Sequence, residues 1–327
     1  ATEKAKPPNI LLIMVDDMGF SDPGCYGGEI NTPNLDALAS GGLRFTQFNN
    51  TSRCWPTRAA LLTGYYPQQV GRDYAPGIIG GGRGKRPDWA PLVPVHLKAA
   101  GYRTYHSGKW HVSGYEIANA GFEHYYFNQG WDRHFTPMNH NLDGDTLPQP
   151  SPEEGYYSTV GITDYLIGFL GEHQEQYPES PFFAYLAYIS PHFPLHAPAD
   201  DIARFRETYT KGWDHLRDRR YQKQISLDII DCELSHRMPE VVPKWNLSEE
   251  KLHDQIGPGE AGRALSWDEL TREQKNFQST KMAIHAAMVY RIDQEVGKLV
   301  KNLKETEVFD NTVILFVSDN GASAEQI

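Results

Sequence analysis

Two continuous apolar runs, one near each end of the chain, most constrain the fold. The first covers residues 9–15 (NILLIMV) and the second covers residues 312–317 (TVILFV). A short apolar run without alternation is typical of a strand buried on both faces of a parallel sheet. Because parallel strands end at the same edge of a sheet, the residues that follow the two runs are expected to lie together. These following residues include Asp16, Asp17, Asp319 and Asn320.

Helical and strand-like segments alternate between the two runs. Strands are predicted over 43–48, 102–106 and 182–189, and helices over 93–100, 159–169 and 270–306. This alternation predicts an α/β fold, a doubly wound and mostly parallel sheet flanked by helices. The polar segment 210–265 interrupts the pattern and is expected to be an irregular insertion. Residues 77–84 are glycine-rich and are expected to form a loop.

Composition narrows the classes of partner. The chain has 327 residues, 39% of them hydrophobic, and a net charge of −11. Such an acidic protein favours neither a nucleic acid nor an anionic membrane as a partner. If its substrate is an anion, positive charge must be concentrated locally. No apolar run approaches the length of a membrane span, and three cysteines make neither a disulfide framework nor a zinc ribbon.

One cysteine lies in an unusual setting. Residues 54–64 read CWPTRAALLTG. Pro56 suits the first turn of a helix, and the following residues are good helix formers. Cys54 would therefore lie at a helix N-terminus, where free N–H groups favour an anion. Arg58, one turn further on, could bind an oxyanion through its fork of donors. The alternative is that Cys54 is a small buried side chain, the usual role of a free cysteine.

Two further polar clusters follow predicted strands. Lys109 and His111 come after the strand 102–106, and His192 comes after the strand 182–189. Each signal is weak alone, because a histidine after proline is more often structural. Together with the acidic residues described above, they would all lie at one edge of the sheet. A preference of single residues for turns or helix caps does not readily explain this common position. His196 is interpreted as a loop histidine.

The motif C-x-P-x-R-x-x-x-x-T-G resembles the signature of the type I sulfatases, the arylsulfatase family within the alkaline-phosphatase superfamily. Further family motifs are present at 15–22 (VDDMGFSD), 108–111 (GKWH), 191–194 (PHFP) and 318–321 (SDNG). The resemblance covers residues 9 to about 323 and is nearest to bacterial arylsulfatases. It implies the sulfatase fold and hydrolysis of a sulfate ester.

The resemblance also implies a chemical modification and a metal ion. A maturation enzyme would oxidise Cys54 to formylglycine (3-oxoalanine), whose hydrate supplies the nucleophilic oxygen. Residue 54 would also contribute an oxygen to the metal. The other implied metal ligands are Asp16, Asp17, Asp319 and Asn320. Carboxylate and amide oxygens suit Ca²⁺, with Mg²⁺ as the alternative.

The remaining roles come from the same resemblance. Arg58 and Lys109 would bind the sulfate group. His111 would act as a base when the sulfated intermediate breaks down, and His192 would contact the leaving-group oxygen as an acid. The substrate could be an aryl sulfate or a saccharide sulfate. Residues 74–90 and 119–152 are expected to shape its pocket.

The resemblance predicts that residues 1–327 form the N-terminal catalytic domain. A smaller C-terminal subdomain, which usually supplies one more lysine near the sulfate, is expected beyond residue 327. The N-terminus has no signal peptide and reads as a mature end or as the boundary of a cloned segment. The expected location is the periplasm or the exterior of a bacterium, with the cytoplasm as the alternative.

Two other functions compete with a sulfatase. One is a phosphate or phosphonate ester hydrolase of the same superfamily, against which the complete cysteine motif argues. The other is a binding or scaffolding protein that keeps the fold without the chemistry. Such a protein would be expected to lack one or more of the five motifs, and all five are present.

Overall fold

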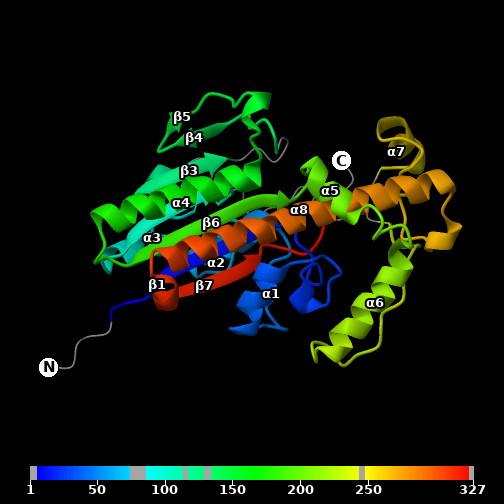
Figure 1. Cartoon of the computed structure of the whole chain (residues 1–327), viewed down its shortest axis with the longest axis horizontal. Coiled ribbons are helices and arrows are strands. Elements are labelled where there is room, and N and C mark those ends of the chain that lie inside the picture. Colours follow the sequence, from blue (N-terminus) through cyan, green and yellow to red (C-terminus); the bar gives the residue numbers. More distant parts are fainter. Residues whose placement is uncertain (1–5, 74–85, 113–116, 129–133, 243–246, 324–327) are drawn as a thin grey trace. The chain divides into compact units, whose positions relative to one another are not determined.

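The chain forms two compact units in a computed structural model that describes residues 6–73, 86–112, 117–128, 134–242 and 247–323 (Figure 1). Unit 1 comprises residues 1–18, 49–194 and 295–321, and unit 2 comprises residues 19–48, 195–294 and 322–327. The glycine-rich segment 77–84 lies outside the described residues. The prediction that residues 1–327 form the catalytic domain of a longer protein stays a prediction.

Unit 1 is built on a mixed, mostly parallel sheet. Within the described residues, its seven strands run in the order β5-β4-β3-β2-β6-β1-β7. The parallel strands are β1 (Asn9–Asp16), β2 (Arg103–Gly108), β3 (His124–Asn128), β6 (Phe182–Pro191) and β7 (Thr312–Ser318). Two short antiparallel strands, β4 (His140–Leu142) and β5 (Asp145–Thr146), extend one edge. The predicted α/β fold with a mostly parallel sheet is confirmed.

Helices pack on both faces of this sheet. They are α2 (Cys54–Thr63), α3 (Val93–Ala99), α4 (Ser158–Gln176) and the C-terminal part of α8 (Arg272–Glu305). Leu12 and Met14 of β1 share a buried cluster with Ala59 and Leu62 of α2. Side chains alternate along a strand, so Ile13 points to the opposite face, and α4 packs on the sheet across β2, β3 and β6 (Figure 1). The first apolar run is therefore buried on both sides.

The predicted strand over 43–48 is wrong. None of these residues is in a strand, and the exposed fraction of the Leu43 side chain is 86%. An alternating sequence forms a strand only where another strand offers hydrogen bonds, and no described strand pairs with this segment. Cys54 therefore does not follow a strand, as the sequence suggested, but begins α2 directly after a loop.

Unit 2 is helical in its described part. Its helices are α1 (Pro33–Ser40), α5 (Ala199–Phe205), α6 (Gly212–Ser226), α7 (Glu249–Gln255) and the N-terminal part of α8. The segment 210–265, expected to be irregular, thus contains two regular helices. The polar composition of α6 hides its period, because few of its side chains are buried. No helix in the described part of the chain is long and apolar enough to cross a membrane.

Candidate active site

Polar side chains from four parallel strands gather at the carboxyl edge of the sheet in unit 1. Asp16 ends β1, Lys109 follows β2, His192 follows β6 and Asp319 follows β7. At this edge the end of β7 is bonded to β1, since Asp319 N donates to Val15 O at 3.1 Å, whereas the pairing of β1 with β6 is irregular between Met14 and Asp16. The sheet thus brings together groups that are up to about 300 residues apart in sequence, as in other parallel α/β sheets.

Arg58 connects two of these strand ends from its position in α2. Its Nε donates to Asp319 Oδ2 at 2.8 Å, and its Nη1 donates to both Lys109 O and Tyr185 Oη. Lys109 Nζ in turn donates to Asp16 Oδ2. All four ionic side chains are 2% exposed or less. Burial of two cations is tolerated because each faces a buried carboxylate.

Two atoms in this network are buried without a hydrogen-bond partner among the described residues. They are Asp16 Oδ1 and Arg58 Nη2, which lie 3.8 Å apart. Buried polar atoms are rarely unsatisfied in proteins. An unused carboxylate oxygen suits a cation, and an unused guanidinium N–H suits an anion.

Asp17 and Asn320 lie beside this network. Asp17 has a left-handed backbone (φ 66°), a conformation that is uncommon outside glycine and often marks functional sites. Asn320 Nδ2 donates to Asp17 Oδ1 at 2.5 Å. Ser318 Oγ accepts from Met18 N at 3.2 Å, so the turn after β1 is tied to the end of β7.

The two histidines of the site have different surroundings. His192 Nδ1 donates to Phe193 O at 2.7 Å, which leaves its Nε2 3.7 Å from Asp17 Oδ2. His111 Nδ1 is buried without a hydrogen-bond partner among the described residues. Burial and then the positive charge of Lys109 lower the pKa of His111 to about 2. His111 is therefore neutral, with a lone pair free to accept a proton.

Cys54 is the first residue of α2 and is partly buried. Burial raises the pKa of its thiol to about 11, because the attraction of Lys109 is outweighed by burial and by the repulsion of Asp16 and Asp319. A thiol with this pKa stays protonated at neutral pH, so it is a poor nucleophile and a poor metal ligand. The unmodified side chain does not suit the chemistry of its surroundings.

The carboxylates at the strand ends fit a divalent cation. Asp16, Asp17 and His192 each offer a ligand atom within 4.8 Å of the other two. The oxygen donors dominate, which suits Ca²⁺ or Mg²⁺ more than a transition metal. Asp319 Oδ2 is already bonded to Arg58, and Asn320 presents its amide nitrogen to Asp17. A half-turn of that amide would present its oxygen instead.

All nine residues proposed from the sequence lie in unit 1, and the structure places them around one edge of the sheet. They are Asp16, Asp17, Cys54, Arg58, Lys109, His111, His192, Asp319 and Asn320. Sequence reasoning missed Tyr185, which contacts Arg58 and donates to Met14 Sδ at 3.3 Å. Tyr185 lies within the apolar run of β6. No local signal indicates that it points toward α2, because every residue of this strand is buried and neither face is marked by charged side chains.

Comparison with known proteins agrees with this geometry. The sequence profile described as Sulfatase matches residues 8–326. An arylsulfatase of Klebsiella aerogenes is 31% identical over 98% of the chain and 67% of its own length. A human N-acetylgalactosamine-6-sulfatase is 28% identical over 99% of the chain and 52% of its own length. The crystal structure of Ps i-CgsB in complex with k-i-k-neocarrahexaose superposes with a TM-score of 0.65 and 26% identity, covering 97% of the chain and 59% of that structure.

The chain spans roughly half to two thirds of the length of the relatives it matches. The matched profile covers almost every described residue of both units, and the relatives include arylsulfatases and a carbohydrate sulfatase. Residues of the five motifs lie at the strand ends and at the start of α2 in unit 1. The chain belongs to the sulfatase family.

Proposed function

We propose that the chain carries the catalytic site of a sulfatase that hydrolyses a sulfate monoester to an alcohol and inorganic sulfate. The observation that carries this proposal is the pair of buried cations, Arg58 and Lys109, held by carboxylates around residue 54. A sulfate ester is an anion, and two fixed cations beside a helix N-terminus are suited to bind it. The unused Nη2 of Arg58 is the donor available for a sulfate oxygen.

The nucleophile in this proposal is formylglycine hydrate at position 54. The protonated Cys54 thiol cannot supply it, which supports conversion of this residue by a maturation enzyme. One hydrate oxygen attacks sulfur, and the S–O bond to the alcohol breaks with its electron pair on the alcohol oxygen. The attacking hydroxyl gives up its proton to water, and His192, as an imidazolium whose Nδ1–H donates to Phe193 O, protonates the alcohol oxygen from Nε2. The products of this step are the alcohol and a sulfated residue 54.

The second step releases sulfate. The remaining hydroxyl of the sulfated hydrate gives its proton to neutral His111, and the C–O bond to sulfate breaks to regenerate the aldehyde. The low pKa of His111, about 2, makes it a weak base while it is buried and surrounded by the cations Lys109, Arg58 and Arg72. A bound sulfate is an anion and would raise this pKa toward a useful value.

A divalent cation held by Asp16, Asp17, Asp319 and Asn320 would polarise the sulfate group and lower the pKa of the hydrate when bound. We favour Ca²⁺, with Mg²⁺ as the alternative, on the donor set alone. Without the cation, Asp16 and Asp319 repel each other, and this repulsion follows burial among the causes that raise the pKa of Asp319. Positive charge between the strand ends would relieve it.

The alcohol part of the substrate is either a saccharide or an aryl group. One related structure holds neocarrahexaose, and one relative is named for N-acetylgalactosamine 6-sulfate. Another relative is an arylsulfatase. These names support a sulfated saccharide as the natural substrate and an aryl sulfate as a convenient test substrate. We further propose a periplasmic or secreted location, by analogy with sulfatases of this kind.

Two measurements on the full-length protein test this function. Protein made in a host with maturation activity should show, by peptide mass spectrometry, an aldehyde in place of the Cys54 thiol. The same preparation should hydrolyse nitrophenyl sulfate or a sulfated saccharide faster than nitrophenyl phosphate. Full activity with an unmodified Cys54 thiol would refute formylglycine hydrate as the nucleophile. A preference for phosphate would instead favour a phosphate ester hydrolase, and no turnover of any ester would favour a binding protein.

A further inference from the structure

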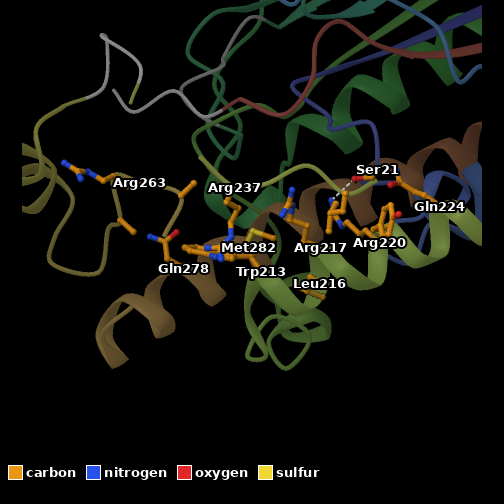
Figure 2. A pocket seen from close by; sticks show the side chains of 14 residues that line it. Ser21, Trp213, Leu216, Arg217, Arg220, Gln224, Arg237, Arg263, Gln278 and Met282 are labelled. Atoms are coloured by element: carbon orange, nitrogen blue, oxygen red, sulfur yellow. Dashed lines mark hydrogen bonds between the residues drawn. The ribbon is translucent and has the colours of Figure 1, made fainter. Parts of the chain in front are cut away.

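Unit 2 contains a cavity of about 540 Å³, a size typical of sites that bind small organic molecules. One face of α6 forms its main wall, with Trp213, Arg217, Arg220 and Gln224 (Figure 2). These positions are separated by four, three and four residues, so they lie on one side of the helix. Met282 of α8 contributes to a second wall. The helix α6 has no apolar stripe, and the side that carries these residues faces the cavity.

The lining is positively charged. It includes four arginines, Arg217, Arg220, Arg237 and Arg263, and no aspartate or glutamate. This is a local exception in a chain whose net charge is −11. Positive charge that is concentrated in one cavity of an acidic protein is the pattern expected of a site for an anion.

Two of the four arginines form ion pairs with carboxylates that do not line the cavity. Arg220 pairs with Glu29 at 2.5 Å and with Asp22 at 3.2 Å. Arg237 pairs with Asp214 at 3.1 Å. These two side chains are fixed by their carboxylate partners, so they shape the cavity more than they supply free charge.

The other two arginines have no carboxylate partner among the described residues. Arg217 donates to the backbone oxygen and the hydroxyl of Ser235, and Arg263 is exposed at the edge of the cavity. Arg217 and Arg237 also line a second cavity of about 460 Å³, whose lining includes Glu269. Arg217 is therefore the central cation of the site, with donors that can turn to an anionic ligand.

Part of the remaining lining is apolar and well fixed, beside the polar side chains of Ser21, Tyr221, Gln224 and Gln278. Trp213 Nε1 donates to Leu265 O at 3.0 Å, and its ring packs edge-on against Trp267 at 5.1 Å. Leu216 and Met282 lie beside it. A tryptophan held in this way offers a surface for the C–H groups of a sugar ring, whereas a bare inorganic anion makes no use of it.

We propose that this cavity binds a sulfated saccharide at a site separate from the cluster around residue 54. Arg217 would bind a sulfate group, Arg263 would add positive charge at the opposite edge of the cavity (Figure 2), and the wall of Trp213, Leu216 and Met282 would contact sugar carbons. The choice of sulfate over another anion rests on the proposed function, because a sulfatase meets sulfated saccharides as substrates. The cavity itself rests only on the residues that line it.

Binding can be measured on full-length protein carrying Cys54→Ala, which prevents turnover. The probe is a sulfated hexasaccharide of the carrageenan type, and the method is titration calorimetry combined with hydrogen exchange of α6. We expect binding to slow exchange in residues 213–224. Adding Arg217→Gln should raise the dissociation constant of this site about tenfold, as expected for loss of one charge-assisted contact. Arg263→Gln provides a second test should Arg217→Gln disturb folding.

The matched control is Arg219→Gln, which removes an exposed arginine of the same helix that does not line the cavity. Its effect on the dissociation constant should stay within about twofold. Equal weakening by both substitutions would mean non-specific attraction and would overturn the proposal. Unchanged affinity in both Arg217→Gln and Arg263→Gln would overturn it as well.

Two further probes identify the ligand. The desulfated hexasaccharide should bind at least about tenfold more weakly, because it offers no anion to Arg217. If inorganic sulfate alone slows exchange in α6 at the same concentration as the hexasaccharide, the site is one for free sulfate and the saccharide is the wrong ligand. The active protein, with residue 54 unchanged, separates the two proposals. Hydrolysis of the ester without binding at α6 refutes only the proposed saccharide site in the cavity. Binding at α6 without hydrolysis refutes only the proposed sulfatase activity.

Discussion

The protein contains two clusters of cations that are built in opposite ways. In unit 1, Arg58 and Lys109 are at most 2% exposed and face buried carboxylates. In the cavity of unit 2, Arg217 and Arg263 are accessible and have no carboxylate partner among the described residues. Buried cations need fixed counter-charges, because desolvation would otherwise exceed the Coulombic gain. The first arrangement is suited to hold reacting groups in one geometry, and the second to bind and release an anion.

The largest expected effect comes from removing a carboxylate of the buried cluster. Asp319→Ala should abolish both binding of the divalent cation and sulfatase turnover, since it removes a proposed metal ligand and the partner of Arg58. Asp214→Ala, which removes the partner of Arg237 in unit 2, is the control and should leave turnover within about twofold. Metal content and initial rates are measured on the same samples. Retained turnover in metal-stripped Asp319→Ala protein would show that the cluster is not the catalytic centre.

The two histidines should separate the two steps of the reaction. General acid catalysis is typically worth about 10²–10⁴-fold. His192→Ala should lose most of this factor on a sugar sulfate, whose alcohol is a poor leaving group, and little on nitrophenyl sulfate. His111→Ala should instead release close to one equivalent of alcohol in a burst and then stall with sulfate bound at residue 54. Equal losses on both substrates and no trapped adduct would contradict these roles.

Local sequence predicted the parts of the site that depend on a single segment. Apolar runs followed by Asp16 or Asp319 indicated strand ends, and Pro56 with its alanines indicated the start of α2. The segment 43–48 was mispredicted because a strand depends on a partner that no local pattern reveals. The bond between Arg58 and Asp319 could not be predicted either, since the two residues are 261 positions apart and their contact depends on the packing of α2 against the sheet.

The cavity of unit 2 escaped sequence analysis for a related reason. Its arginines occur in a polar segment, and a helix with few buried residues shows no apolar stripe. The spacing of Trp213, Arg217, Arg220 and Gln224 is helical, but it becomes informative only once α6 is known to face a cavity. The cavity is recognised from the distribution of charged side chains within unit 2 and not from its hydrophobic pattern.

The next largest effect is a difference in the free energy of unfolding between variants of the buried cluster in unit 1 and of the cavity in unit 2. Arg58→Met leaves Asp319 buried without the cation bonded to it, and breaking a buried pair in this way typically costs about 3–5 kcal/mol. Arg217→Met removes an accessible arginine that bonds only to Ser235 among the described residues, and its cost should be below about 1 kcal/mol. Urea unfolding of both variants in the absence of metal gives the two values. Similar losses would mean that burial does not separate the clusters energetically.

The smallest expected effect is an opposite dependence of stability on pH in the two units. In metal-free protein, burial and then Asp16 raise the pKa of Asp319 to about 6, so between about pH 4 and 6 the folded state holds this proton while the unfolded state has lost it. The contribution of Asp319 to stability therefore falls as pH rises through this range. In unit 2, burial of Asp22 is outweighed by His285 and Arg220, which lower its pKa below 3.8. Its contribution is present above that value and is lost as pH falls.

Variants that cannot titrate test these signs. Asp319→Asn should make the slope of unfolding free energy against pH more positive between pH 4 and 6, by at most about 1.4 kcal/mol per pH unit. Asp22→Asn should instead reduce the loss of stability below about pH 4. The slope and not the absolute stability is the readout, because both substitutions also change hydrogen bonds. Urea unfolding in chelator from pH 3 to 7 measures both slopes, and a change of the same sign in the two variants would remove this difference between the buried cluster and unit 2.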